Sequence, residues 1–271
     1  MTHAPITSLH SPHVERVKAL LGSRGKKIRN LEHILVADGM QSLRSALNPQ
    51  VSFAPQIVRL YLTDTGLEKL LAEFSQAEID QHEVIMVSDQ VMAAMAETES
   101  PQGVLALCKY RPTEISHFEK SSLRRVAYFW EIQDPGNAGT AIRTADACGF
   151  DLVAFSPQSV DVYSPKVIRS TAGSMWNIPV ATDISLDQLT ELAQNHQMSI
   201  VALDAGGNRE ISKLNLNQPL ALVFGNEARG LPALPTDFEL VSIPMQGRAE
   251  SLNVASAAAI AMYLTSAANN S

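Results

Sequence analysis

The stretch LALVFGNEARGLP, residues 220–232, runs from an apolar segment directly into a polar loop. The apolar residues Ala221–Phe224 predict a buried strand of a parallel sheet, because such strands are near-continuous hydrophobic runs. Gly225 and Gly230 in the following loop allow backbone to approach a ligand closely or to adopt positive φ. Their spacing matches neither the dinucleotide GxGxxG fingerprint nor the Walker phosphate loop. The stretch therefore predicts an α/β sheet with a ligand loop of another kind.

Strand-like and helical segments alternate on both sides of this stretch. Such alternation predicts a mostly parallel sheet, with its ligand site at the carboxyl ends of the strands. We expect strands at Arg125–Trp130, Asp151–Phe155, Ser199–Leu203, Ala221–Phe224 and Glu239–Ile243, and helices at Asn137–Cys148, Ser164–Met175, Leu186–Asn195 and Leu252–Ser266.

A second, smaller α/β module precedes this one. It has expected helices at Val14–Leu21, Met40–Leu47, Gly66–Phe74 and Asp89–Met95, and expected strands at Ile34–Ala37, Ile57–Leu62, Glu83–Val87 and Gly103–Leu107. The polar segment after it contains a proline and is typical of a linker. We expect a first domain at 1–110, a linker at 111–122 and a second domain at 123–271.

Composition limits the class of protein. The chain has 271 residues, 45% of them hydrophobic and 18% charged, which is typical of a globular protein with a sizeable core. We find no apolar segment long enough for a membrane span and no signal peptide at the N-terminus. Cys108 and Cys148 lie in apolar surroundings without a metal-ligand pattern, so we expect reduced thiols, a cytoplasmic protein and no metal site.

Charge is unevenly distributed. The net charge of −7 argues against a protein that coats nucleic acid by bulk electrostatics. The segment from Arg16 to Arg29 contains six basic residues and no acidic one. Glu15 lies just before it. This segment could neutralise RNA phosphates, or it could be a solvated helix end and loop. Its basic residues are Arg16, Lys18, Arg24, Lys26, Lys27 and Arg29.

Two further loops follow strands of the second module. In EIQDPGNAGTAIRTADACGF, residues 131–150, Asn137 is a natural N-cap and Arg143 follows near the second helical turn. In ELVSIPMQGRAESLNVASAAAIAMY, residues 239–263, Ser251 and Asn253 begin an alanine-rich helix. Ser and Asn are both preferred N-caps, so capping and chemistry are both open for this pair.

Taken together, the three loops resemble the motifs of the SpoU, or TrmH, family of RNA ribose methyltransferases. The resemblance rests on NxGxxxR, FGNEARGLP and IPMxGxxxSLNVAxAxAI in this order, and on SPKVIRSTAGS (164–174) between the first two motifs. The first module, with PQGVLAL at 101–107, is similar to the L30-like substrate-binding domain that precedes some members. LVADG at 35–39 departs from that pattern, which has a Glu before the glycine. The resemblance implies a parallel-sheet α/β domain with a deep trefoil knot, preceded by a small α/β domain.

The resemblance also implies a site. S-adenosylmethionine would bind at Leu203, Gly225, Ile243 and Leu252, with residues 203–206 forming a wall. The catalytic residues would be Asn137, Arg143, Glu227, Ser251 and Asn253. Glu227 and Asn137 would hold Arg143 and the ribose, and Arg143 would orient a phosphate and stabilise the alkoxide. Its high intrinsic pKa makes a role as general base difficult. RNA would bind at Arg24, Lys26, Lys27, Arg29 and Arg169.

The expected activity is methyl transfer to a ribose 2′-hydroxyl of RNA by a homodimer that joins through the second domain. Ribosomal RNA is the expected substrate, and transfer RNA is the alternative. A non-catalytic RNA-binding or ribosome assembly protein on the same fold would not need all five catalytic residues. A nucleotide-dependent oxidoreductase is disfavoured because the glycine fingerprint is missing.

Overall fold

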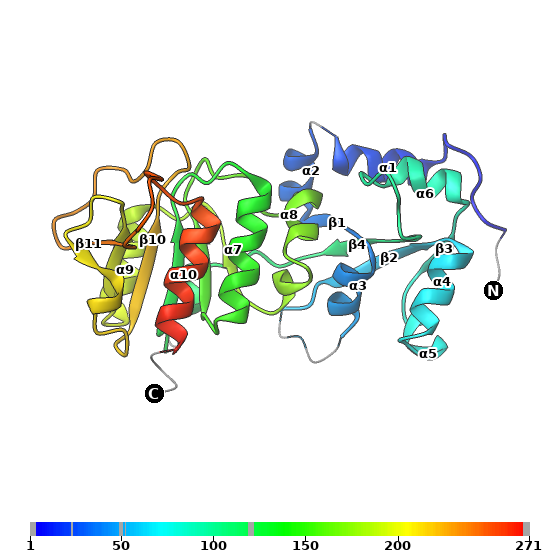
Figure 1. Ribbon diagram of the computed structural model, residues 1–271. Coiled ribbons are helices and arrows are strands. Elements are labelled where there is room, and N and C mark those ends of the chain that lie inside the picture. The colour runs from blue at the N-terminus through cyan, green and yellow to red at the C-terminus, as the bar shows by residue number, and fades with distance from the viewer. Residues whose placement is uncertain (1–3, 23, 49–50, 52, 119–121, 268–271) are drawn as a thin grey trace. The chain divides into compact units, whose positions relative to one another are not determined.

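The computed structural model describes residues 4–22, 24–48, 51, 53–118 and 122–267 (Figure 1). The chain forms two compact units. Unit 1 comprises Met1–Arg111 together with Tyr163–Asn177, and unit 2 comprises Pro112–Val162 together with Ile178–Ser271. One cut near residue 111 therefore does not separate the two units, because residues 163–177 of the second module pack with the first.

Unit 1 contains a four-stranded sheet in the order β1-β4-β2-β3. β4 is antiparallel to both β1 and β2, and β3 is parallel to β2. The strands are β1 (Ile34–Asp38), β2 (Gln56–Leu62), β3 (Val84–Met86) and β4 (Val104–Lys109). The helices are α1 (Pro12–Leu21), α2 (Gly25–Glu32), α3 (Met40–Leu47), α4 (Asp64–Leu71), α5 (Gln76–Ile79), α6 (Asp89–Met95) and α8 (Pro165–Ser170), and η2 (Ser174–Trp176) is a 3₁₀ turn.

Local signals explain where helix α1 begins and which face it buries. The Ser11 side chain accepts a hydrogen bond from the Val14 amide, and Pro12 occupies the first turn, where its missing N–H costs nothing. Val14, Val17 and Leu20 then lie one helical turn apart and are fully buried. They join residues of α6 and of the sheet in one hydrophobic cluster.

The segment 163–177 packs with unit 1 through aromatic side chains. Tyr163 stacks on Tyr110 with ring centroids 3.9 Å apart. Trp176 is buried, and its indole Nε1 donates to the Ser42 carbonyl over 3.2 Å. The helix expected at Ser164–Met175 ends at Ser170, because Ala172 and Gly173 adopt positive φ. The sequence pattern does not show that this segment belongs to unit 1.

Unit 2 is built on a seven-stranded parallel sheet in the order β7-β6-β5-β10-β8-β11-β9. The expected parallel sheet is therefore confirmed. Helix α7 packs against α10, which also contacts β10, and α9 packs on β8 (Figure 1). The strands are β5 (Arg125–Phe129), β6 (Leu152–Phe155), β7 (Val180–Ala181), β8 (Ser199–Leu203), β9 (Arg209–Glu210), β10 (Leu220–Phe224) and β11 (Glu239–Ser242). The helices are α7 (Pro135–Ala147), α9 (Leu186–Asn195) and α10 (Val254–Ala267), with 3₁₀ turns η1 (Ile115–Phe118) and η3 (Ile211–Lys213).

Part of the expected linker is folded. Ile115 and Phe118 in η1 are partly buried against the core of unit 2. Residues 119–121 of the linker lie outside the described residues. The trefoil knot stays a prediction.

Three findings bear on the expected class of protein. In the described part of the chain, no helix combines the length and the hydrophobicity needed to cross a membrane. The same residues contain no cluster of three His, Cys, Asp or Glu side chains that could hold a metal ion. Both cysteines are free, with Cys108 buried and Cys148 half-buried.

Candidate active site

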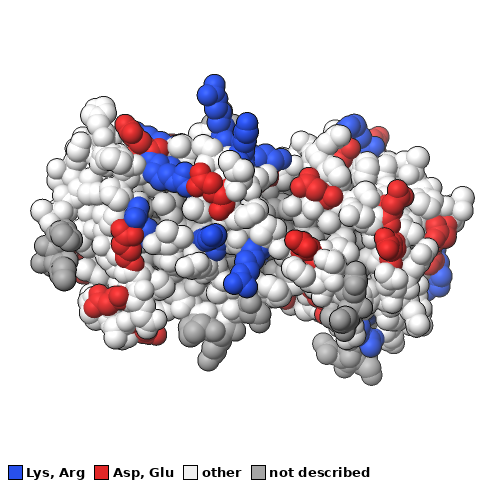
Figure 2. Space-filling view, turned by 180° about the vertical axis from the view of Figure 1, so that it is seen from behind, with Lys and Arg blue, Asp and Glu red and all other residues white. Residues whose placement is uncertain are grey.

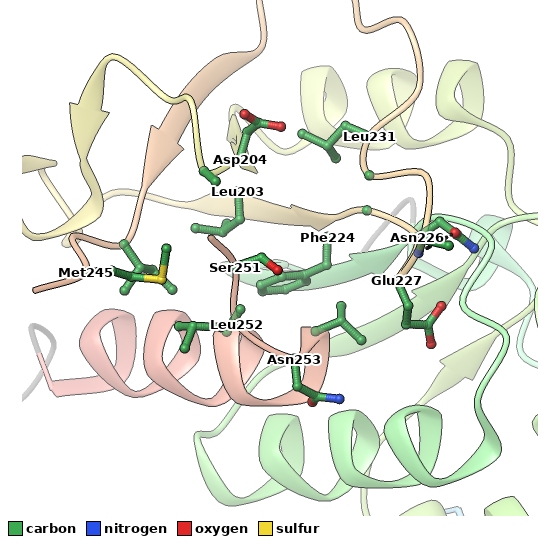
Figure 3. Close-up of a pocket in the computed structure, with 17 residues that line it drawn as sticks. Leu203, Asp204, Phe224, Asn226, Glu227, Leu231, Met245, Ser251, Leu252 and Asn253 are labelled. Carbon is green, nitrogen blue, oxygen red and sulfur yellow. Dashed lines mark hydrogen bonds between the residues drawn. The ribbon is translucent and has the colours of Figure 1, made fainter. Parts of the chain in front are cut away.

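A pocket of about 550 Å³ opens at the carboxyl ends of β8, β10 and β11, close to the start of α10 (Figure 3). This is the edge of a parallel sheet at which ligands bind. Its volume falls within the usual range for small-molecule sites. All four residues predicted to bind the cosubstrate line it: Leu203, Gly225, Ile243 and Leu252.

Three predicted catalytic residues form a hydrogen-bonded chain beside this pocket. Asn253 Nδ2 donates to Asn137 Oδ1 over 3.0 Å, and Asn137 Nδ2 donates to Glu227 Oε1 over 3.2 Å. The Glu227 carboxylate also accepts from the amides of Gln133 and Asp134 at 3.2–3.3 Å. Glu227 and Asn253 line the pocket. Each of the three sequence motifs therefore contributes one side chain to a single network.

The cap of α7 is not the expected one. Asp134, rather than Asn137, is the N-cap, and its Oδ1 accepts from the Asn137 amide over 2.8 Å. Pro135 fixes φ at the first helical position, so the helix starts two residues before Asn137. With the cap supplied by Asp134, the side chain of Asn137 is available to Glu227 and Asn253.

Asn253 caps α10 with one side-chain atom and bonds to Asn137 with the other. Its Oδ1 accepts from the amides of Ala255 and Ser256, at 2.9 and 3.2 Å, which caps α10. Its Nδ2 makes the bond to Asn137. Ser251 lies two residues before the cap and lines the pocket (Figure 3). Ser251 is thus not the cap of α10.

The loop after β10 is held in a narrow turn by Asn226, a residue that the sequence reasoning missed. Asn226 Nδ2 donates to the Glu131 carbonyl over 2.6 Å, and its Oδ1 accepts from the amides of Ala228 and Arg229. The signal was present, because an Asn that follows a strand commonly folds the chain into an Asx turn. At Gly225, an added Cβ would lie 2.5 Å from the carbonyl carbon of Gly230. The close backbone approach predicted at Gly225 is therefore between Gly225 and Gly230 of the same loop.

Arg143 lies apart from the residues expected to hold it. Its side chain on α7 is exposed, and among the described residues it makes neither an ion pair nor a hydrogen bond. Arg143 lies six positions after Asn137, which places the two side chains on different faces of the helix. The Glu227 carboxylate binds Asn137 and the start of α7 instead. The guanidinium of Arg143 is consequently free for an external anion.

The basic segment runs from the second half of α1 into α2, and three of its four predicted RNA contacts lie at the surface. Arg24, Lys26 and Lys27 are exposed. Arg29 is only 5% exposed, and its Nη1 donates to the Leu20 carbonyl. The Arg29 side chain therefore fastens α2 to the end of α1, an arrangement that does not support the RNA contact predicted for it. On the face shown in Figure 2, basic side chains project in the region of α2, and elsewhere both charges are interspersed.

Arg169 also has protein partners. Its guanidinium lies 3.2 Å from Glu97 Oε2 and 3.8 Å from Asp38 Oδ2. Burial raises the pKa of the Asp38 carboxyl, and the charge of Arg169 opposes this shift. An arginine between two acids does not offer a free positive charge, so the expected phosphate contact has no support in this arrangement.

Comparison with known proteins agrees with both modules. Residues 124–263 match the SpoU rRNA Methylase family, and residues 14–106 match the MRM3-like substrate binding domain. The chain is 38% identical over 182 residues to the 23S rRNA (guanosine(2553)-2′-O)-methyltransferase RlmP of Bacillus subtilis, covering 66% of this chain and 70% of that protein.

Two further similarities extend over nearly the whole chain. An uncharacterized tRNA/rRNA methyltransferase of Synechocystis is 32% identical over 268 residues, covering 96% of this chain and 92% of that protein. The crystal structure of an AdoMet-bound rRNA methyltransferase from Sinorhizobium meliloti matches with a TM-score of 0.81 at 27% identity, covering 96% of both chains. The motif order, the parallel sheet and these matches together show that the chain belongs to the SpoU rRNA methylase family.

Proposed function

We propose that the protein transfers the methyl group of S-adenosylmethionine to a ribose 2′-hydroxyl of ribosomal RNA. The observation that carries this proposal is the chain from Asn253 through Asn137 to Glu227 at the mouth of the pocket. It brings together residues from three loops that lie far apart in sequence. RlmP, a similar protein, is named for this reaction on 23S rRNA.

The reaction sets clear requirements. The ribose oxygen attacks the methyl carbon, the S–CH₃ bond breaks, an O–CH₃ bond forms and the hydroxyl proton is released. Because a hydroxyl is a weak nucleophile, the enzyme must position it and stabilise the developing alkoxide. Arg143 meets the second requirement, since its exposed guanidinium has no partner among the described residues and can bind an oxyanion bidentately. Asn137 and Asn253 are held by their mutual hydrogen bond and meet the first requirement.

The cosubstrate would occupy the pocket. Leu203, Ile243 and Leu252 supply apolar surface, and Gly225 keeps the turn after β10 narrow. Ser251 and Asn253 line the same pocket, and we expect the cosubstrate and the RNA to meet beside them. When bound, S-adenosylmethionine supplies the activated methyl group.

RNA would bind unit 1 through α2. Lys26 and Lys27 are exposed on this helix, with Arg24 at its N-cap. Replacing both lysines by Gln should weaken RNA binding and flatten its dependence on salt, because each lost phosphate contact reduces counterion release. A Lys69→Gln, Lys109→Gln double variant removes the same charge from other parts of unit 1 and serves as the control. Equal effects of the two double variants would contradict a specific role for α2.

A homodimer is part of the proposal. On α10, Ile260 is 39% and Tyr263 is 66% exposed, and their spacing of three residues places them on one face. A partner copy that covers this face would bury both side chains. Light scattering after gel filtration should give twice the chain mass, and Tyr263→Glu should give the monomer. A wild-type protein that stays monomeric at micromolar concentration would refute the dimer.

We place the enzyme in the cytoplasm, where ribosomal RNA is its substrate.

The test of the activity maps 2′-O-methylation across total RNA from cells with and without this protein. One missing position in ribosomal RNA supports the proposal, and a missing position in transfer RNA would favour the alternative substrate.

In vitro, Arg143→Ala should abolish transfer of a labelled methyl group and leave cosubstrate affinity nearly unchanged. Arg143→Lys keeps the charge without the planar fork and should retain part of the activity. Equal loss of transfer and of cosubstrate affinity in Arg143→Ala would refute the assigned role.

A further inference from the structure

The pocket carries ionisable side chains of one sign only. Asp204 and Glu227 line it, and no Lys, Arg or His is among the described residues that do. This negative lining suits a cationic sulfonium. Glu227 is already engaged by Asn137 and by two backbone amides. The second acid has no such role.

Asp204 stands at the end of β8 in a fixed backbone setting. Its amide donates to the Val241 carbonyl over 2.9 Å, and its carbonyl accepts from the Gly207 amide over 3.0 Å. Its Oδ1 accepts from the Gly206 amide over 2.7 Å, which closes a tight turn. Oδ2 has no partner among the described residues. The carboxylate is therefore oriented by the turn, with one oxygen left for an external donor.

The surroundings of this carboxylate indicate a ligand with hydroxyl donors. Asp204 lines the pocket together with Leu203 and Leu231, and in Figure 3 its oxygens point away from Glu227 and Asn253. S-adenosylmethionine offers two kinds of donor, the ribose hydroxyls and the ammonium group. The ammonium group lies next to the cosubstrate's own carboxylate. Asp204 would repel that carboxylate, and the described residues that line the pocket include no basic side chain to hold it. The ribose hydroxyls carry no such penalty, and carboxylates commonly bind a ribose in this way.

We propose that the Asp204 carboxylate accepts a hydrogen bond from the 2′-hydroxyl of the cosubstrate ribose and makes the pocket selective for a ribosyl ligand. This inference rests on the proposed function, because it assumes that the pocket holds S-adenosylmethionine.

The experiment is calorimetric titration of the full chain with S-adenosylhomocysteine, 5′-methylthioadenosine and 2′-deoxy-5′-methylthioadenosine. The second ligand keeps the ribose and lacks the amino-acid chain, and the third also lacks the 2′-hydroxyl. Asp204→Ala should weaken the first two by roughly tenfold or more, since a hydrogen bond to a charged group is lost. The wild type should bind the 2′-deoxy ligand more weakly than 5′-methylthioadenosine by a similar factor. Asp204→Ala should bind these two ligands with equal affinity.

Two further variants separate binding from folding. Asp204→Asn keeps an oxygen for the Gly206 amide and removes the charge, so it should fold normally and bind both ribosyl ligands less tightly. Glu191→Gln on α9 is the matched control, because this exposed acid lies outside the pocket, and it should bind all ligands as the wild type does.

Each contrary result has its own meaning. If Asp204→Ala weakens S-adenosylhomocysteine and leaves 5′-methylthioadenosine unchanged, Asp204 holds the ammonium and the inference is wrong. Unchanged affinity for both ligands would also overturn it, while the proposed function would stand. A wild-type protein that binds none of the ligands would overturn the inference together with the proposed function.

Discussion

Asn253 offers a sharp test of the site, because its two side-chain atoms do different things. Oδ1 caps α10 by accepting from two backbone amides, and Nδ2 donates to Asn137. Asn253→Ala removes both interactions. Asn253→Asp keeps an acceptor for the cap and cannot donate to Asn137. Comparing the two variants separates helix stability from the geometry of the site.

The expected magnitudes follow from these contacts. Loss of an N-cap costs about 0.5–2 kcal/mol, and the exposed bond to Asn137 adds about 0.5 kcal/mol. Asn253→Ala should therefore lower the free energy of unfolding by about 1–2.5 kcal/mol, and the melting temperature by roughly 2–10 °C, at about 2–4 °C for each kcal/mol in a protein of this size. Asn253→Asp should melt close to the wild type, because its negative charge also suits a helix N-terminus. It should still lose activity, since the new carboxylate would face Asn137 Oδ1, and two acceptors cannot form the hydrogen bond that now joins the two residues.

The assays are thermal unfolding followed by circular dichroism, and methyl transfer at saturating cosubstrate. We expect both variants to lose transfer by about ten- to a hundredfold, because small displacements of positioning groups have effects of this size. Only Asn253→Ala should lose stability. A fully active Asn253→Asp would refute the role of the bond to Asn137. An Asn253→Asp as unstable as Asn253→Ala would refute the capping role of Oδ1.

Three further variants or measurements test other contacts. Gly225→Ala should abolish cosubstrate binding in calorimetry, because its Cβ would lie 2.5 Å from backbone of the facing strand of the loop; wild-type affinity would contradict this. Trp176→Phe should lower the free energy of unfolding by about 1–3 kcal/mol in urea titrations, since the buried Ser42 carbonyl loses its donor, and an unchanged midpoint would count against that bond. Burial raises the pKa of Cys108 to about 12, so a thiol reagent at pH 8 should label it only after denaturant is added. Fast labelling of the folded protein would contradict this, because it would show that the thiol is accessible.

Elements with strong local signals were predictable from sequence. The helix expected at Leu186–Asn195 has these bounds in the structure, where Ser185 and Gln188 form a capping box at its start. The strand Ser199–Leu203 that follows was also predicted residue for residue. In both cases the deciding interactions lie within a few residues of the element.

Features that depend on distant partners were not predictable. Arg29 reads as a surface cation, and its burial depends on the Leu20 carbonyl at the end of another helix. The segment 163–177 reads as part of the second module, and its place in unit 1 depends on Tyr110 and Ser42. Periodicity and capping preferences do not contain these partners, because both describe only neighbours along the chain.

The site itself lies between these two cases. Resemblance to a family brought the three loops together, but only the structure shows how the helix starts are arranged. Asp134 caps α7 and Asn253 caps α10, and the bond between Asn137 and Asn253 joins the first turns of these packed helices. Two positive helix ends therefore converge at the mouth of the pocket. Glu227 binds the start of α7 and offsets one of them. In the proposed reaction, the start of α10 and Arg143, which has no partner among the described residues, would favour the negative charge that develops on the ribose oxygen.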